Sequence, residues 1–387
     1  MTTASSERRT IRVGLVGAGY MAKTHTLGYR NAGLIYGADV PKVELVAVCD
    51  LTEELARAGA DRWGWGDATA DWRRITQGED IDLVDVVTPN DAHAEVAIDA
   101  ALHGKHVICE KPLATRLDDV YAMCDAVAAA GVTHQTGFYY RLWPAVQEAR
   151  RLIDAGRIGS IRHVRGRFFQ DYASQESFPF SWRFDRAAAG AGALGDIGSH
   201  ILDLVRFLGG DIARIAAQGR TLVPVRPDAR GGGERQVDVD DLYSMLLQFE
   251  SGASGSVEAS WAATGHKCDL GFEVIGDRGA IQFTWERSNE LRFYSEEDAE
   301  AERGFRTVLI GGVHPNAAPF WFAPGQGLGY GDAFTMGIGA MLRGLADGEP
   351  VRPDFHDGAR AAELVDAALR AHAAGGWVDV ARREVPA

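Results

Sequence analysis

Short unbroken runs of apolar residues alternate with amphipathic stretches along the first 138 residues of the chain. A run that is apolar at every position is typical of a parallel strand buried on both faces, and apolar residues three or four positions apart are typical of the covering helices. Because parallel crossovers are right-handed, the carboxyl ends of such strands gather at one edge of the sheet. The pattern predicts strands at 11–16, 43–49, 83–87, 106–109 and 132–136, and helices at 20–31, 52–63, 92–103 and 117–130.

After Gly137 the pattern changes to alternating strands separated by turn residues. Such alternation indicates an antiparallel sheet with one face buried on helices and the other available. We expect a helix with a clean apolar stripe directly after Gly195, an extended loop at 33–42 and an exposed loop at 223–233. The pattern also predicts a helix at 144–154 and strands at 161–170, 242–249, 256–260, 270–275, 280–285 and 291–294.

The length of 387 residues exceeds what one hydrophobic core usually organises. The two patterns therefore predict an α/β protein of two domains. Residues 1–138 form a Rossmann dinucleotide-binding domain, and residues 139–387 form a second α/β domain with a large, open-faced, mainly antiparallel sheet.

The net charge of −14 argues against nucleic acid and anionic membrane partners, which need clustered cations. The 46% hydrophobic content is ordinary for a globular protein, and no apolar run reaches the length of a membrane span. The four cysteines show neither paired spacing nor a metal-binding C-x-x-C pattern. We therefore expect a cytoplasmic protein without structural disulfides.

The segment Gly17-Ala18-Gly19-Tyr20-Met21-Ala22 follows the first strand and opens the first helix. In this context Gly17 permits a tight turn, Gly19 lets the backbone approach a pyrophosphate, and Ala22 is small enough for close packing of helix on strand. The phosphates would lie at the helix N-terminus. We expect this loop, including Tyr20 and Met21, to bind a dinucleotide.

Asp50 ends the second predicted strand, where an acid can bind the ribose 2′-hydroxyl and repel a 2′-phosphate. Its neighbours Leu51 and Thr52 provide no cation, so NAD is favoured over NADP. In the alternative interpretation, Asp50 caps the helix that begins near Thr52.

Lys111 follows the fourth predicted strand, at the same edge as the glycine loop. The apolar run Val107–Cys109 before it makes an ordinary surface lysine an unattractive interpretation. Pro112 fixes the backbone beside it and can form a cis peptide bond.

Asp196 and His200 lie four residues apart on the helix expected after Gly195. A histidine that titrates near neutral pH suits general-base chemistry on an alcohol. Two alternatives remain: Asp196 as an N-cap with His200 as a satisfied polar residue, or both as metal ligands. No third ligand with suitable spacing appears, so we expect no metal.

These motifs together resemble the Gfo/Idh/MocA family of NAD(P)-dependent sugar and cyclitol dehydrogenases over nearly the whole chain. The resemblance also rests on Thr88-Pro89-Asn90 with His93, on Glu110-Lys111-Pro112 and on Gly137-Phe138-Tyr139-Tyr140-Arg141. It implies that Lys111 and His200 form the catalytic pair, that Asp196 orients the substrate, and that the second domain assembles dimers or tetramers. The resemblance adds to the expected NAD site Thr88, Pro89, Asn90, His93, Glu110, Lys111 and Arg183.

Within this family the chain looks most similar to the branch that contains levoglucosan and myo-inositol dehydrogenases, on Gln170-Asp171, 181–184 and 327–331. One departure is Tyr139, where relatives often carry asparagine, and it leaves the detailed sugar specificity open. The residues that we expect around the substrate, beside Lys111, Asp196 and His200, are Arg141, Asp171, Trp182, Arg183 and Tyr330.

This mixture of aromatic and polar groups suits a compact polyhydroxylated ring, whereas Asp171 and Asp196 would repel a carboxylate. We therefore expect NAD-dependent oxidation of a secondary ring hydroxyl of a neutral sugar, anhydrosugar, glycoside or cyclitol. A levoglucosan-like pyranose stands slightly ahead of an inositol. Two other classes remain, an NAD-dependent glycosidase and a non-enzymatic sugar-sensing regulator. The retained Lys111, Asp196 and His200 argue against the regulator.

Overall fold

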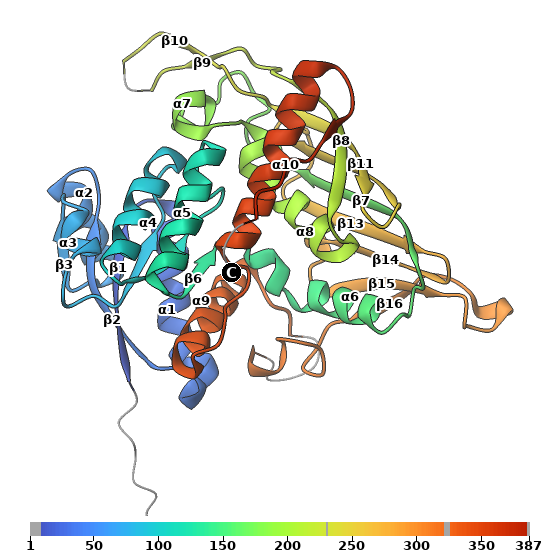
Figure 1. Ribbon diagram of the computed structural model, residues 1–387, viewed down its shortest axis with the longest axis horizontal. Coiled ribbons are helices and arrows are strands. Elements are labelled where there is room, and N and C mark those ends of the chain that lie inside the picture. Colours follow the sequence, from blue (N-terminus) through green and yellow to red (C-terminus); the bar gives the residue numbers. More distant parts are fainter. Residues whose placement is uncertain (1–8, 230, 321–325, 385–387) are drawn as a thin grey trace, which may run out of the picture. The chain divides into compact units, whose positions relative to one another are not determined.

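The computed structural model describes residues 9–229, 231–320 and 326–384 (Figure 1). The contacts divide them into two units. The first holds the described residues up to Tyr139 together with Gly329–Ala359, and the second holds Tyr140–Leu328 and Arg360–Glu384. Part of the chain that follows Leu328 therefore belongs, by its contacts, to the first unit.

The first unit is built on a parallel sheet, which in the described chain has six strands in the order β3-β2-β1-β4-β5-β6. Its two central strands, β1 and β4, are mostly apolar and mostly buried because helices cover both faces, as the unalternating sequence predicts. The strands are β1 (Thr10–Val16), β2 (Lys42–Cys49), β3 (Asp67–Thr69), β4 (Leu83–Val86), β5 (His106–Cys109) and β6 (His134–Thr136). The helices that alternate with them are α1 (Tyr20–Tyr36), α2 (Glu53–Trp63), α3 (Arg73–Thr76), α4 (His93–Leu102) and α5 (Leu117–Ala130).

Helix α9 (Tyr330–Asp347) packs against α1 within this unit. Small residues make the close approach possible, since a Cβ on Gly28 would lie 2.9 Å from Ile338 and a Cβ on Gly339 would lie 2.2 Å from the Tyr36 ring. Helix α10 (Phe355–Ala374) begins in the first unit and continues in the second.

The second unit is built on a mainly antiparallel sheet with, in the described residues, nine strands in the order β16-β15-β14-β13-β7-β12-β11-β8-β17. Only the pair β7 and β12 is parallel among these neighbours. The strands are β7 (Ile161–Phe169), β8 (Ile212–Arg220), β11 (Leu242–Phe249), β12 (Ser254–Ser260), β13 (Asp269–Gly276), β14 (Gly279–Thr284), β15 (Glu290–Ser295), β16 (Arg306–Leu309) and β17 (Val378–Asp379).

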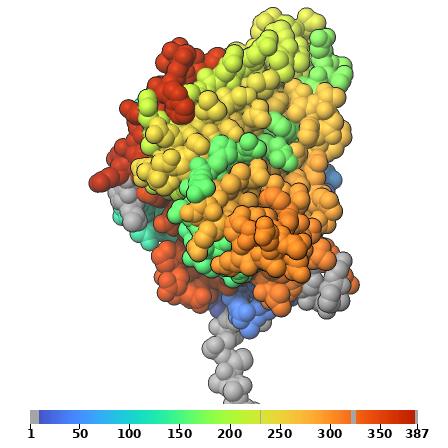
Figure 2. All heavy atoms as spheres, turned by 90° about the vertical axis from the view of Figure 1, so that its right-hand side faces the viewer, coloured from blue at the N-terminus to red at the C-terminus, as the bar shows by residue number. Residues whose placement is uncertain are grey.

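Helices α6 (Pro144–Asp154) and α8 (Ser199–Gly209) pack on one face of this sheet. Gly166 of β7 lets α8 pack closely on the sheet, because any larger residue would clash with the helix: a Cβ there would lie 2.6 Å from Val205. On β11 the buried positions alternate with exposed ones, which include Ser244 and Leu246 on the opposite face. Figure 2 shows one broad face of this unit, with β7 in green between its yellow and orange neighbours.

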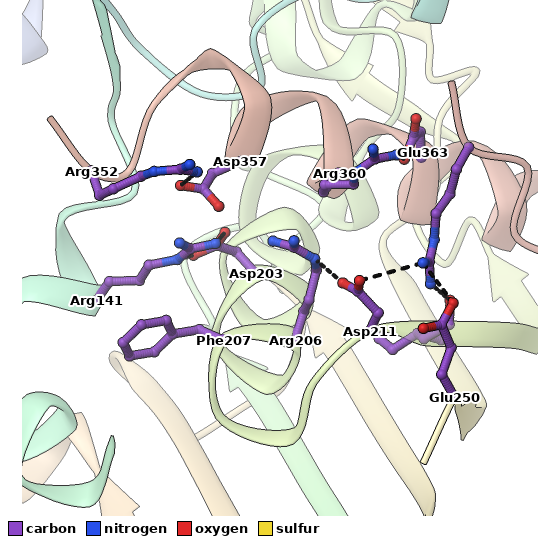
Figure 3. A network of polar contacts seen from close by, with 12 residues as sticks. Arg141, Asp203, Arg206, Phe207, Asp211, Glu250, Arg352, Asp357, Arg360 and Glu363 are labelled. Carbon is purple, nitrogen blue, oxygen red and sulfur yellow. Dashed lines mark hydrogen bonds and ion pairs between the residues drawn. The ribbon is translucent and has the colours of Figure 1, made fainter. Parts of the chain in front are cut away.

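A chain of ion pairs joins α8 to the end of the described chain within the second unit. Arg206 lies 2.7 Å from Asp211, and Arg382 contacts both Asp211 (3.3 Å) and Glu250 (2.7 Å). These contacts attach the C-terminal segment to the β8 side of the sheet (Figure 3).

Two loop predictions are wrong in part. Helix α1 continues to Tyr36 and is followed by a 3-10 turn, so the extended loop expected at 33–42 shrinks to a few residues. In the loop expected at 223–233, Val225–Pro227 forms the strand β9, paired with β10 (Glu234–Gln236). Arg226 is fully buried there, because Asp241 and the carbonyl of Ala173 accept its hydrogen bonds.

The helix predicted after Gly195 also differs in its first turn. The segment η5 (Leu194–Gly198) is a π-helix, and α8 follows it directly. A single π turn inserts one residue into a helix and is frequent at functional sites. It changes the angular relation between Asp196 and His200 from the one expected of an α-helix.

Candidate active site

The glycine loop lies at the carboxyl end of β1, in the centre of the parallel sheet. Gly17 has a φ of 106°, and a Cβ there would lie 2.9 Å from the backbone carbonyl of Val87. Gly19 precedes α1 without a side-chain cap, and a Cβ at this position would meet nothing within 4 Å. The loop is thus an open cradle at a helix N-terminus, which fits a dinucleotide pyrophosphate. Beside it Tyr20 is exposed and Met21 is half-buried.

Asp50 lies against this cradle at the end of β2. Its Oδ2 accepts a hydrogen bond of 2.7 Å from the backbone N–H of Ala18, and its Oδ1 accepts one of 2.6 Å from Leu51. The cap of α2 is instead Thr52, whose hydroxyl accepts from the N–H of Leu55 at 3.2 Å. The geometry therefore disfavours the capping interpretation and keeps a carboxylate beside the glycine loop.

The loop after β4 carries Thr88, Pro89 and Asn90. Thr88 Oγ1 is buried and has no hydrogen-bond partner in the described structure, so a bound group could satisfy it. His93 is fully buried, with Nε2 2.9 Å from the carbonyl oxygen of Thr88 and Nδ1 2.9 Å from that of Pro112. Its ring thus connects the loops that follow β4 and β5.

Glu110 and Lys111 follow β5 at the same edge of the sheet, and the Lys111–Pro112 peptide bond is cis. Glu110 is buried and its Oε2 accepts from the backbone N–H of Lys111 at 3.1 Å. Burial alone would raise the pKa of Glu110, but the hydrogen bond and charge of His25, aided by Lys111, hold that pKa below its usual value. The carboxylate next to Lys111 is therefore ionised.

Tyr139, the departure from the usual asparagine, is buried in the first unit. Its ring packs edge-on to Phe334 at 5.3 Å and lies 5.8 Å from the His25 ring. A Cβ on Gly337 would lie 2.3 Å from this ring, so the glycine on α9 makes room for the larger side chain.

In the second unit, Asp240 fixes the segment that carries Asp196 and His200. Its carboxylate accepts from the N–H groups of Gly192 (2.9 Å) and Leu194 (2.8 Å), and its own carbonyl accepts from Ala193 (3.0 Å). Burial raises the pKa of Asp240. Three consecutive backbone donors are thus satisfied where the π turn begins.

Asp196 contacts one of the expected neighbours, Arg183, which in turn contacts Trp182. The Nε of Arg183 lies 3.6 Å from Asp196 Oδ2, and the guanidinium of Arg183 stacks over Trp182 at 4.5 Å. The hydroxyl of Tyr172 donates to Asp196 Oδ2 at 3.4 Å. The N-cap interpretation of Asp196 is not supported, because α8 has Gly198 at its N-cap and no side-chain cap.

His200 is half-buried on the first turn of α8. The ring of Tyr140 packs edge-on to it at 5.0 Å, and Phe168 lies 6.0 Å away. Tyr140 in turn contacts Trp285 at 4.7 Å. An aromatic wall therefore orients the imidazole in the second unit.

Three expected substrate residues have other partners. Arg141 is buried in the second unit in a bidentate pair with Asp203 (Figure 3). Asp171 Oδ2 accepts from Lys267 Nζ at 2.6 Å, and this bond lowers the pKa of Asp171. Tyr330, expected on a loop of the second domain, is instead the first residue of α9, and its contacts assign it to the first unit.

Sequence reasoning missed His25, Asp85, Tyr172 and Asp240. None of them lies in a sequence motif associated with catalysis or binding. The hydrogen-bond partner of each is more than 20 residues away along the chain. Asp85, inside the otherwise apolar run 83–87, was the available signal, whereas Asp240 lies among other acids at 238–241 and gave none.

Among the residues that the structure describes, no group of three or more His, Cys, Asp or Glu side chains could hold a metal ion. No helix in the described ranges is long and apolar enough to cross a membrane.

Two family models match the chain. The model of the oxidoreductase family with an NAD-binding Rossmann fold covers residues 11–138, and that of the GFO/IDH/MocA C-terminal domain covers residues 146–282. The first unit is thus an NAD-binding Rossmann domain.

Characterised relatives match over almost the full length. A levoglucosan dehydrogenase of Pseudarthrobacter phenanthrenivorans is 40% identical over 96% of this chain and 98% of its own. An inositol 2-dehydrogenase of Rhizobium meliloti is 28% identical over 96% of this chain and 100% of its own. A solved levoglucosan dehydrogenase in complex with NADH and levoglucosan has a TM-score of 0.94 at 39% identity, covering 97% of this chain and 100% of that one.

Proposed function

Because this chain belongs to the GFO/IDH/MocA family of NAD-dependent oxidoreductases, we propose that it oxidises a secondary ring hydroxyl of a neutral sugar, anhydrosugar, glycoside or cyclitol. The observation that carries this proposal is that two of the motifs lie at the same edge of the parallel sheet. The open glycine cradle follows β1, and an ionised Glu110 with Lys111 follows β5, two strands away. A dinucleotide site and a proton-handling lysine therefore share one edge.

In this reaction NAD, when bound, accepts the hydride. His200 takes the proton of the reacting hydroxyl, since an imidazole can serve as a base near neutral pH. Lys111 stabilises the negative charge that develops on the alkoxide, and Asp196 orients the substrate. The Arg183–Asp196 contact of 3.6 Å and the aromatic packing of His200 support these roles because both side chains are held in place.

The residues proposed to serve the cofactor extend along the same edge. The pyrophosphate would bind to the glycine loop, at Gly17, Gly19, Tyr20 and Met21. The adenosine ribose would bind to Asp50. A second group follows β4 and β5, and His93 acts in it by holding the two loops together. This group, with Arg183 from the second unit, comprises Thr88, Pro89, Asn90, His93, Glu110, Lys111 and Arg183.

We propose a levoglucosan-like pyranose ahead of an inositol as the substrate. The full-length similarity to the levoglucosan dehydrogenase supports the first, and the similarity to the inositol 2-dehydrogenase keeps the second as the alternative. In the second unit Arg183 links Trp182 to Asp196, and such a mixture of aromatic and polar groups suits a neutral ring. Arg141 and Asp171 also belong to the proposed set, and they are held there by Asp203 and Lys267. Tyr330 completes the proposed set.

We propose that residues 1–138 form the dinucleotide-binding domain. Residues 139–387 are proposed to form the domain that binds substrate and mediates assembly. We propose a homodimer or homotetramer formed through the open face of the sheet. A row of bonded side chains crosses this face, since Arg292 donates to Gln282, Gln282 donates to Glu273, and Arg165 lies 3.5 Å from Glu273. The row ends near the exposed Leu246. We also propose a cytoplasmic location, because the four cysteines show no paired spacing along the sequence.

A screen for NADH release tests the proposal. Purified enzyme with NAD is offered levoglucosan, inositols, glucose, xylose, simple glycosides, a sugar acid and a sugar phosphate. A dehydrogenase accumulates NADH in proportion to product, an NAD-dependent glycosidase recycles it while cleaving the glycoside, and a regulator releases none. A much higher kcat/KM for the acid or phosphate than for every neutral ring would contradict the proposal.

A further inference from the structure

The helix that follows the glycine loop carries a histidine that lies between two carboxylates. His25 of α1 is fully buried. Its Nδ1 lies 2.8 Å from Asp85 Oδ2, and its Nε2 lies 3.0 Å from Glu110 Oε1. An ionised carboxylate only accepts hydrogen bonds, whereas a neutral imidazole has one N–H donor. Both contacts are therefore satisfied together only when His25 is an imidazolium.

The surroundings of His25 agree with this charge. Tyr29 donates to Asp85 Oδ2 at 2.9 Å, and the rings of Tyr139 and Phe334 lie 5.8 and 5.5 Å from the imidazole. Burial alone would lower the pKa of His25, but the charges and hydrogen bonds of Asp85 and Glu110 raise it to about 10. With one cation between two carboxylates, these three groups carry a net charge of −1.

This cluster ends on the residue before Lys111. The second oxygen of Glu110 accepts from the Lys111 backbone N–H, and the Lys111 ammonium contributes to the low pKa of Glu110. Glu110 has no room to shift toward Gly137, because even a Cβ there would lie 2.7 Å from its Oε1. On the other side of Lys111, the carbonyl of Pro112 faces His93 Nδ1 at 2.9 Å. The backbone around Lys111 is thus fixed from both sides.

Stability alone gives no reason for this arrangement. A buried ion pair repays its desolvation cost only with good geometry, and well-packed apolar residues are often as stable. Buried charges that converge on one functional residue are typical of a site that must be held in a precise geometry.

We propose that His25, held as an imidazolium by Asp85, is a positioning residue for the reaction, which fixes Glu110 and through it the backbone that presents Lys111. This inference rests on the proposed role of Lys111. His25 itself touches neither substrate nor cofactor in this scheme, and its effect reaches the chemistry through Glu110.

The test compares the wild type with His25→Gln and with the double variant Asp85→Asn/His25→Gln. Glutamine keeps an amide donor for Glu110 but removes the charge, which leaves two uncompensated buried carboxylates. The double variant removes one of these carboxylates and returns the cluster to a net charge of −1. The matched control is His106→Asn at the opposite end of β5, because His106 only accepts from the N–H of Thr133 at 3.0 Å and asparagine keeps an acceptor.

We expect His25→Gln to lower kcat about 10²-fold, the effect of a small misplacement of a catalytic group. NADH affinity, measured by fluorescence, and the KM for substrate should stay near their wild-type values. The double variant should recover part of the lost kcat, and His106→Asn should retain all of it. A wild-type kcat in His25→Gln, or losses that simply multiply in the double variant, would overturn the proposal.

Nitrogen NMR of ¹⁵N-histidine-labelled protein provides a readout that does not depend on turnover, with the His25 resonances assigned from their loss in His25→Gln or, should that variant not fold, in the double variant. We expect imidazolium shifts for His25 from pH 6 to 9, and a neutral ring at pH 7 would overturn the proposal. If the wild type releases NADH but His25→Gln is unimpaired, the positioning role alone fails. If the wild type releases no NADH with any neutral ring, the proposed function fails and the positioning role fails with it.

Discussion

At the residue scale, two carboxylates of the first unit bind backbone N–H groups of the motifs that the sequence singles out. Asp50 accepts a hydrogen bond from the N–H of Ala18 in the glycine loop, and Glu110 accepts one from the N–H of Lys111. A motif search could find both acids, since each ends a predicted strand. It could not find His25, whose partners Asp85 and Glu110 lie 60 and 85 residues away. Only the folded sheet brings these three together.

Asp50→Ala should weaken the use of NAD and improve the use of NADP relative to it. The substitution removes the acceptor for the ribose 2′-hydroxyl and the charge that repels a 2′-phosphate. Steady-state kcat/KM for both cofactors measures the change, with Asp39→Ala, an exposed acid on the turn after α1, as the control. A wild type that prefers NADP would contradict the role given to Asp50.

The raised pKa of His25 predicts a pH dependence of stability. Between the ordinary histidine pKa near 6.5 and the folded value of about 10, the folded state binds more protons than the unfolded state. The stabilisation from this group is therefore complete below pH ~6.5 and is lost as pH rises toward 10, with a slope of at most about 1.4 kcal/mol per pH unit. Urea unfolding of wild type and His25→Gln should show their difference shrinking from pH 7 to 10. A constant difference would contradict a charged His25.

At the scale of elements, hydrophobic periodicity predicted a helix or strand well where turn or capping residues mark both of its ends. The helices 117–130 and 144–154 and the strands 106–109 and 242–249 have the predicted bounds. The π turn at Leu194–Gly198 could not be predicted, because it depends on Asp240, 42 or more residues further along, which binds the backbone before it. The short strand at Val225–Pro227 could not be predicted either, because an arginine is normally exposed and Arg226 is buried only through its pairing with Asp241.

Asp240→Ala tests whether this contact sets the position of Asp196 and His200. Two N–H groups lose a charged acceptor, which should cost about 1–3 kcal/mol of unfolding free energy and lower kcat. NADH affinity should not change, because the glycine cradle belongs to the first unit. Thermal unfolding, kinetics and NADH fluorescence measure these effects. The control is Asp238→Ala, which removes an exposed carboxylate that accepts from the backbone N–H of Arg186 at 2.7 Å and does not bind the π turn. A normal kcat in Asp240→Ala would show that the π turn does not depend on this acid.

At the scale of the whole molecule, the sequence predicted the parallel and antiparallel sheets but not every segment that builds each unit. The open face of the second sheet follows from alternation on β11, where every second residue is exposed. The assignment of Gly329–Ala359 to the first unit does not follow from order along the chain. It depends on the fit of α9 against α1, including the small residues Gly28 and Gly339, which only the fold reveals.

Leu246→Asp tests assembly through the open face. Leu246 is 55% exposed on this face. In an interface between identical subunits, an aspartate there would either be repelled by the same aspartate of the other subunit or be buried without its hydration, and both effects destabilise the interface. We expect a smaller mass by size-exclusion chromatography with light scattering. Leu102→Asp on α4, with a leucine that is 69% exposed in the first unit, should leave the mass unchanged. An unchanged mass for Leu246→Asp would assign assembly to another surface.

The most direct test of the proposed reaction is the rate of NADH formation from the best neutral ring by wild type and His200→Ala. Loss of a positioned general base should lower kcat roughly 10²–10⁴-fold while the NADH dissociation constant stays near the wild-type value. His103→Ala, which changes a surface histidine at the end of α4, should behave as wild type. A His200→Ala enzyme that forms NADH at a near-normal rate would contradict the mechanism.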